Sequence, residues 1–196
     1  MAVVSCQARH GYLGWLDRAV MAALQKRQHP VGAVTAARAV SALAEPAVVS
    51  ALLATGFLSR RPHADWAATA MTGVTIASGV AARRLLSVAI ARPRPPVGGW
   101  LTKPEGFSLP SKHATLTGLA VGAWLRRSRP AGPAADLRSA AAVAAMGASR
   151  VYLGVHWPTD ILAAWLYAEG WLRLAELIGV GARDGTSALA GTADAA

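Results

Sequence analysis

The chain has 196 residues, of which 54% are hydrophobic and 15% are charged, whereas about 25% are charged in ordinary soluble domains. Its net charge of +10 favours an anionic partner, such as a membrane surface or a phosphorylated substrate. The basic residues lie scattered between apolar runs, which argues against nucleic acid, and the single cysteine, Cys6, excludes an internal disulfide and a cysteine-based metal site. Because alanine supplies much of the apolar content, hydropathy alone also leaves a soluble helical bundle open.

The first half of the chain predicts three helices. Residues 12–27 form a short amphipathic helix that cannot cross about 30 Å of hydrocarbon, so we place it at the membrane interface. A helix of a soluble bundle fits this segment equally well. Residues 34–58 predict a second helix, and residues 66–90 predict a third that is long enough to span a bilayer. The N-terminus lacks the pattern of a cleavable signal peptide, so we expect an internal span to insert the chain.

The second half predicts three further helices after a loop rich in proline and glycine over residues 92–111. These helices cover residues 112–125, 137–148 and 158–178. We therefore predict an all-α, integral-membrane bundle of five to six helices, with five spans and an interfacial helix, or six spans. Residues 1–178 form a single domain in this prediction, and residues 179–196 form a flexible tail.

The arginines predict an orientation in the membrane. Two arginine pairs fall on one side if the spans alternate, namely Arg60–Arg61 and Arg126–Arg127. The positive-inside rule makes that side cytoplasmic. The loops at 92–111 and 149–157 then face the extracytoplasmic side.

Three segments on that side carry groups suited to phosphate chemistry: Arg92–Pro95 (RPRP), Leu109–His113 (LPSKH) and Ser149–Asp160 (SRVYLGVHWPTD). Ser111 can cap a helix whose free N–H groups suit a phosphate. Asp160 follows His156 by four residues, so its carboxylate can reach one imidazole nitrogen and leave the other free to attack.

Other residues of these segments complete the chemistry. His113 can protonate a leaving oxygen, and Arg94 and Arg150 can hold phosphate oxygens. Taken singly, such a histidine is more often structural and such an arginine more often an interface anchor. Two histidines, two arginines and an aspartate on one side of an apolar chain together indicate a functional site.

The three segments resemble the signature of the PAP2 (type 2 phosphatidic acid phosphatase) superfamily, which also includes vanadium haloperoxidases. That signature is a lysine, six residues and Arg-Pro, then Pro-Ser-Gly-His, then Ser-Arg, five residues, His, three residues and Asp. The third motif matches from Ser149 to Asp160. The second has Lys112 in place of glycine, and the first matches at Arg94-Pro95 but has Ser87 in place of lysine. The resemblance covers residues 84–165.

The resemblance implies a role for each matching residue. His156 would be the nucleophile that forms a phosphoenzyme, Asp160 would orient it, and His113 would be the general acid. The phosphate would be bound by Arg94, Arg150, Ser111 and Lys112. We expect Lys112 to replace the missing lysine, with Arg83 and Arg84, one helical turn before Ser87, as alternatives.

The resemblance also implies a function and a location. We expect a metal-independent phosphatase without cofactors, in the plasma membrane, with its site on the extracytoplasmic side. The small size and the alanine- and arginine-rich composition favour a polyprenyl (di)phosphate or a polyprenyl-phosphoryl-phosphoribose of cell-wall lipid metabolism. Phosphatidylglycerol phosphate and phosphatidic acid remain alternatives, as does a non-catalytic membrane protein that binds lipid phosphates. Vanadate-dependent halide oxidation is disfavoured, because those relatives are soluble and much larger.

Overall fold

The computed structural model describes residues 12–45, 47–49, 66–128 and 132–193. Its described elements are all helical, which confirms the all-α prediction: α2 (Tyr12–Gln25), α3 (Val31–Ala42), α5 (Trp66–Ile90), the short 3₁₀ helix η1 (Val97–Gly99), α6 (Lys112–Ser128), α7 (Pro133–Tyr152) and α8 (Pro158–Ala193).

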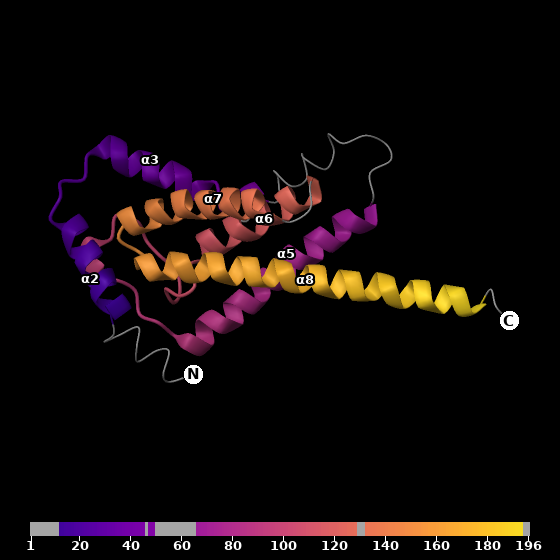
Figure 1. Cartoon of the computed structure of the whole chain (residues 1–196). Coiled ribbons are helices and arrows are strands. Elements are labelled where there is room, and N and C mark those ends of the chain that lie inside the picture. Colours follow the sequence, from indigo (N-terminus) through magenta and orange to yellow (C-terminus); the bar gives the residue numbers. More distant parts are fainter. Residues whose placement is uncertain (1–11, 46, 50–65, 129–131, 194–196) are drawn as a thin grey trace.

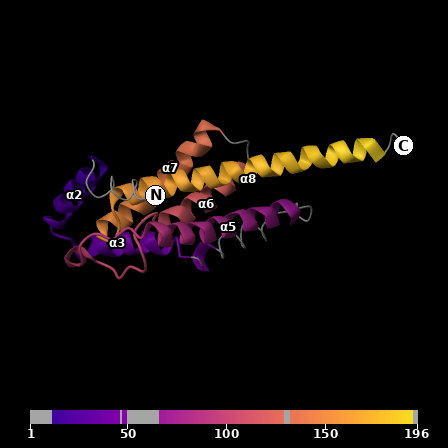
Figure 2. The same ribbon diagram turned by 90° about the horizontal axis from the view of Figure 1, so that it is seen from below.

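The helix α6 lies at the centre of the bundle and contacts α5, α7 and α8 (Figures 1 and 2). Leu119 is fully buried there and belongs to an apolar cluster that also contains Ile76 of α5 and Leu172 of α8. A second cluster joins Ala114, Val143 and Ala164 of α6, α7 and α8. The core therefore fixes the starts of α6 and α8 relative to each other.

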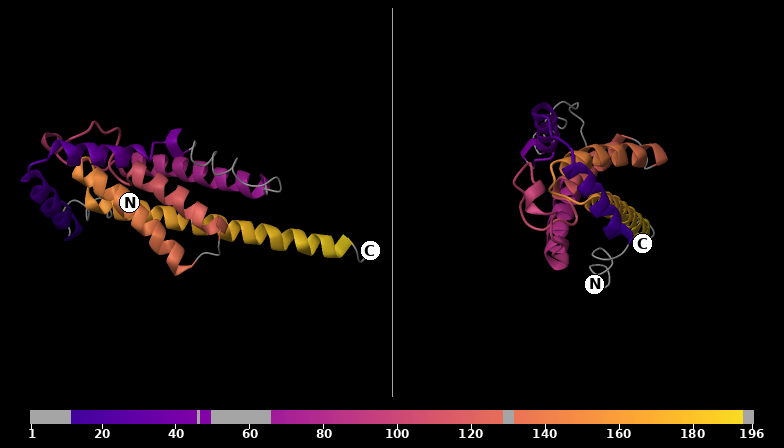
Figure 3. Two further views of the ribbon diagram at one scale, coloured as in Figure 1. Left: turned by 90° about the horizontal axis from the view of Figure 1, so that it is seen from above. Right: turned by 90° about the vertical axis from the view of Figure 1, so that its left-hand side faces the viewer.

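The helix α2 lies across one end of the bundle (Figures 1 and 3). Its buried positions are Gly14, Asp17 and Met21, whereas Leu13 and Leu16 are exposed. The sequence places Leu13 and Leu16 on the apolar face of an interfacial helix and Asp17 off that face, and in the structure the two leucines are exposed whereas Asp17 is buried. Asp17 is buried because it binds charged and polar groups at the start of α8, as described below.

The predicted helix over residues 34–58 is wrong as a single helix. Instead, α3 ends at Ala42 and is followed by a turn over residues 43–45. The presence of Pro46 in the sequence explains this end, because a proline lacks an N–H group and in a continued helix its ring would clash with the carbonyl four residues earlier, at Ala42. Most of the remaining predicted helix, with Arg60 and Arg61, lies outside the described residues.

The later boundaries follow proline positions. The third predicted helix is present as α5, at residues 66–90. The helix α7 begins at Pro133 rather than at 137, since proline is well suited to the first helical position. The helix α8 does not end at 178 but continues to Ala193, and no proline follows Pro158. The division into a domain and a flexible tail stays a prediction.

One helix of the described ranges, Thr69–Ile90 within α5, is both long and apolar enough to cross a membrane. It has 22 residues and a mean hydropathy of 1.4. The number of spans stays a prediction. The end of α5, the end of α7 and the starts of α6 and α8 meet at the end of the bundle that carries α2 (Figure 1).

Candidate active site

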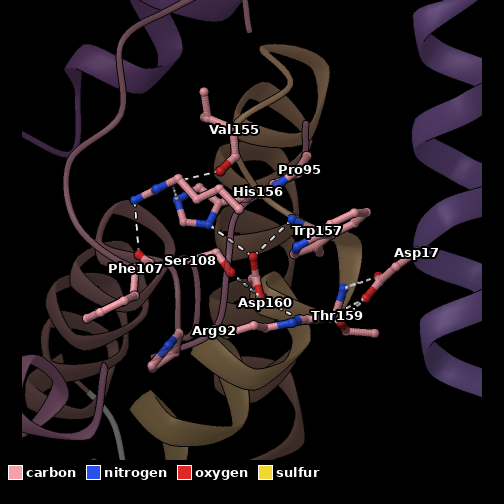
Figure 4. A network of polar contacts seen from close by, with 12 residues as sticks. Asp17, Arg92, Pro95, Phe107, Ser108, Val155, His156, Trp157, Thr159 and Asp160 are labelled. Carbon is pink, nitrogen blue, oxygen red and sulfur yellow. Dashed lines mark hydrogen bonds and ion pairs between the residues drawn. The ribbon is translucent and has the colours of Figure 1, made fainter. Parts of the chain in front are cut away.

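A buried pair, His156 and Asp160, forms the centre of the site, between α7 and the first turn of α8. The Asp160 Oδ2 atom lies 3.2 Å from Nδ1 of His156 and accepts the N–H of Trp157 at 2.9 Å (Figure 4). Because a carboxylate accepts hydrogen bonds, Nδ1 carries the ring proton. The other ring nitrogen, Nε2, therefore holds a lone pair, and the spacing of four residues does bring these two side chains together.

Arg94 lies directly against that second nitrogen, with its Nη1 atom 3.1 Å from Nε2 of His156. The guanidinium is fixed by backbone carbonyls of the surrounding loops: Glu105, Gly106, Phe107 and Val155. Burial lowers the pKa of Arg94 to about 10, so it remains charged at neutral pH. The site thus holds a permanent cation next to the free nitrogen of His156.

The protonation state of His156 follows from its surroundings. Burial lowers its pKa to about 4, the hydrogen bond and charge of Asp160 act in the opposite direction, and Arg94 and Arg150 lower it further. At neutral pH the ring is therefore neutral, which is the state that a nitrogen nucleophile requires.

Two buried polar groups of the second and third motifs have no hydrogen-bond partner among the described residues. They are the hydroxyl of Ser111 and the Nε atom of Arg150. Another guanidinium nitrogen of Arg150 donates to Ser41 of α3 at 3.3 Å. Because buried donors usually have a partner, both free groups are suited to bind the acceptor oxygens of an anion.

His113, in the first turn of α6, is paired with Glu45, which follows α3. The Nε2 atom of His113 lies 3.0 Å from Oε1 of Glu45. This hydrogen bond is the main reason why the pKa of the Glu45 carboxyl is lowered. The sequence gives Glu45 no role, and Pro46 is the one signal that places it in a turn rather than in a helix.

The position of the missing first-motif lysine is occupied by Ser87, which is buried on α5. Arg83 lies one turn earlier, and its Nη2 atom is 3.4 Å from the Ser87 hydroxyl. Its Nε and Nη2 atoms also donate to the carbonyl of Pro110, at 2.9 and 2.7 Å. Arg83 therefore extends from α5 to the second motif.

The other two candidate cations lie differently. The side chain of Lys112 is 38% exposed, and its Nζ atom lies 3.8 Å from Glu105. Arg84 is exposed on α5. Among these candidates, Arg83 is the one that contacts the backbone of the second motif.

The structure also reveals residues to which the sequence analysis assigns no function. Asp160 Oδ1 accepts from Arg92 at 2.6 Å and lies 3.5 Å from the Ser108 hydroxyl. Arg92 in turn binds Asp17 of α2 (Figure 4). A charged residue directly after an apolar span was a usable signal for Arg92. No local pattern links it to Asp17, which is 75 residues away.

Comparison with known proteins agrees with this fold. The fold is similar to the transmembrane PAP2 type phosphatidylglycerolphosphate phosphatase from Bacillus subtilis, with a TM-score of 0.73, 19% identity and coverage of 92% of each chain. It is also similar to LpxE from Aquifex aeolicus, with a TM-score of 0.64, 17% identity and coverage of 80% of this chain and 92% of that one. No curated protein sequence matches at a significant level. The sequence model of the PAP2 superfamily matches residues 35–179, and the chain therefore belongs to this superfamily.

Proposed function

We propose that this protein hydrolyses a phosphate from a membrane lipid through a phosphohistidine on His156. The observation that carries the proposal is the state of this buried ring. Its Nδ1 proton is bound by Asp160, and its Nε2 lone pair lies beside the guanidinium of Arg94. A neutral, oriented nitrogen next to a fixed cation is suited to attack an anionic phosphorus centre.

The reaction has two steps. Nε2 of His156 bonds to phosphorus, the bond between phosphorus and the leaving oxygen breaks, and that oxygen takes a proton from His113. Water then attacks the phosphohistidine, the P–N bond breaks, and the water proton passes to His113 as inorganic phosphate forms. Arg94, Arg150 and Ser111 hold the phosphate oxygens in both steps.

We assign the role of the missing first-motif lysine to Arg83. Its hydrogen bonds to the Pro110 carbonyl support this choice, because they direct the guanidinium to the segment that begins α6. The alternative, Lys112, is partly exposed and lies near Glu105. An arginine in this position presents a planar fork of donors that matches phosphate geometry.

A membrane location is supported by the surface of α5. Its exposed apolar side chains include Met71, Val74, Leu85 and Val88, in a helix long enough to cross a bilayer. Exposed apolar patches of this kind suit lipid contact. We place the site on the extracytoplasmic side of the plasma membrane, because Arg126 marks the opposite end of α6.

We propose a polyprenyl (di)phosphate or a polyprenyl-phosphoryl-phosphoribose as the first substrate to test. Phosphatidylglycerol phosphate is the second candidate, favoured by the shared fold with the Bacillus subtilis phosphatase. Phosphatidic acid completes the set. All four offer the same terminal phosphate to the site and differ in the lipid that leaves.

The test is phosphate release by the purified protein in detergent with EDTA, using each of these lipids. We expect release from one of them, its loss in His156→Gln, and retention in His29→Gln, which changes a histidine that packs on Tyr152. Rapid quenching with radiolabelled substrate should trap an acid-labile, base-stable phosphate on the wild-type protein. Equal release by wild type and His156→Gln would refute the proposal.

A further inference from the structure

Three charged side chains form a buried row that ends at the nucleophile. Arg92 lies between two carboxylates, with Nη2 2.6 Å from Oδ2 of Asp17 and Nη1 2.6 Å from Oδ1 of Asp160 (Figure 4). Their exposed fractions are 8% for Arg92, 1% for Asp17 and 0% for Asp160. Asp160 is the residue that holds the ring proton of His156.

Asp17 belongs to α2, yet it binds two residues that lie next to Asp160, the partner of the nucleophile. Besides Arg92, it accepts the backbone N–H of Thr159 at 3.0 Å and the Thr159 hydroxyl. A buried ion pair contributes little to stability compared with apolar packing of similar volume. Anchoring α2 to the bundle therefore does not by itself explain a carboxylate at this position.

The charge balance of the row suggests a different role. Two carboxylates and one guanidinium leave one net negative charge beside the His156 ring. When Nε2 bonds to phosphorus while Nδ1 keeps its proton, the ring becomes cationic. That cation is stabilised by a net negative charge nearby, and the effect is strong because the site is buried.

We propose that Asp17 is a positioning residue that neutralises Arg92, so that Asp160 keeps its negative charge available for the cationic ring of phosphorylated His156. Without Asp17, Arg92 would cancel the charge of Asp160. This inference rests on the proposed function. It gives α2, which lies outside the three sequence motifs, an indirect part in the phosphoryl-transfer step, through Arg92 and Asp160.

The first test is Asp17→Asn, with steady-state kinetics on the lipid that the wild type hydrolyses. We expect kcat to fall on the order of 10- to 100-fold. KM should stay unchanged or decrease, because the substrate is an anion and the variant removes a negative charge. The control is Asp136→Asn, which removes a carboxylate from ion pairs with Arg126 and Arg173 of α6 and α8. It should lower thermal stability and leave kcat unchanged.

The decisive variant is Asp17→Asn combined with Arg92→Gln, which restores one net negative charge. We expect its kcat to lie within about tenfold of the wild type and above that of Asp17→Asn. If Asp17→Asn does not fold, the double variant alone decides, because it has the same net charge as the wild-type row. A double variant as slow as Asp160→Asn would overturn the inference, as would an unchanged kcat in Asp17→Asn. Failure of the proposed function would give a different result, because the wild type would then release no phosphate or His156→Gln would still release it.

Discussion

At the scale of single residues, the environment of His156 controls when the site can react. Its Nε2 atom must be unprotonated to attack phosphorus, and burial lowers its pKa to about 4. The competent fraction therefore falls only as the pH drops through that value. We expect the acid limb of kcat/KM near pH 4 and not near about 6.5, the pKa of an exposed histidine.

This pH dependence is measured as kcat/KM over a pH series on the purified protein. The substrate phosphate also titrates, with a second pKa of about 6, so the free substrate must be titrated separately. An acid limb that still lies near 6.5 after this correction would contradict the buried, neutral state of His156.

Gly154 allows the turn before His156 to pass close to the backbone of Gly99. Its φ of +76° lies in the left-handed region, and a Cβ atom built there would lie 2.0 Å from the carbonyl oxygen of Gly99. We expect Gly154→Ala to destabilise the fold by about 1–3 kcal/mol and to reduce kcat. The matched control is Gly98→Ala, where a Cβ would meet nothing within 4 Å. Similar melting temperatures for the two variants would refute this view of the loop.

The identity of the cation that replaces the missing first-motif lysine can be tested at two positions. Because Arg83 contacts the Pro110 carbonyl and Lys112 extends towards Glu105, we expect Arg83→Gln to raise KM on the order of tenfold or more. Lys112→Gly restores the superfamily motif and should change KM much less. The reverse order, measured on the same lipid, would assign the role to Lys112.

At the scale of elements, α7 and α8 pack closely where the chain turns into the site. A Cβ atom on Gly147 would lie 2.1 Å from Cγ2 of Ile161, the residue after Asp160. We expect Gly147→Ala to cost about 1–3 kcal/mol of stability through overpacking. Ile161→Ala in the same chain should recover part of that loss. Gly170→Ala, on an open face of α8, is the control and should not destabilise. Absence of recovery in the double variant would contradict direct packing.

The element boundaries show which sequence signals were sufficient. The uncharged run from residue 66 and the following Pro93 defined α5 correctly. The end of α3 was missed because the apolar pattern continues through Pro46, and the helix-breaking effect of that proline outweighs the pattern. The prediction starts the helix at residue 137 and so leaves Pro133 outside it, although a proline fits the first helical turn.

At the scale of the whole molecule, contacts distant in sequence explain what the motifs could not predict. The contact of His156 with Asp160 follows from a spacing of four residues. The pairs of His113 with Glu45 and of Arg92 with Asp17 join residues 68 and 75 positions apart. Such pairs depend on how α2 and α3 dock on the bundle, and no periodicity in a single sequence encodes that docking.

The orientation of the molecule in the membrane can be tested through its two ends. The helix α7 has 20 residues, so at about 1.5 Å per residue its start lies roughly 30 Å from the site loop. Val97 in η1 is 70% exposed at the site end, and Arg138 is exposed near the start of α7. Each can be changed to cysteine after Cys6, the single native cysteine, is replaced by serine.

We expect a membrane-impermeant maleimide to label Val97→Cys in intact spheroplasts and to label Arg138→Cys only after permeabilisation. This follows from the predicted orientation, in which the pairs Arg60–Arg61 and Arg126–Arg127 face the cytoplasm and the site faces outwards. Phosphate release by both variants in detergent is the control for folding. Labelling of Arg138→Cys but not Val97→Cys in intact spheroplasts would invert the topology, and the site would then draw its lipid from the cytoplasmic leaflet.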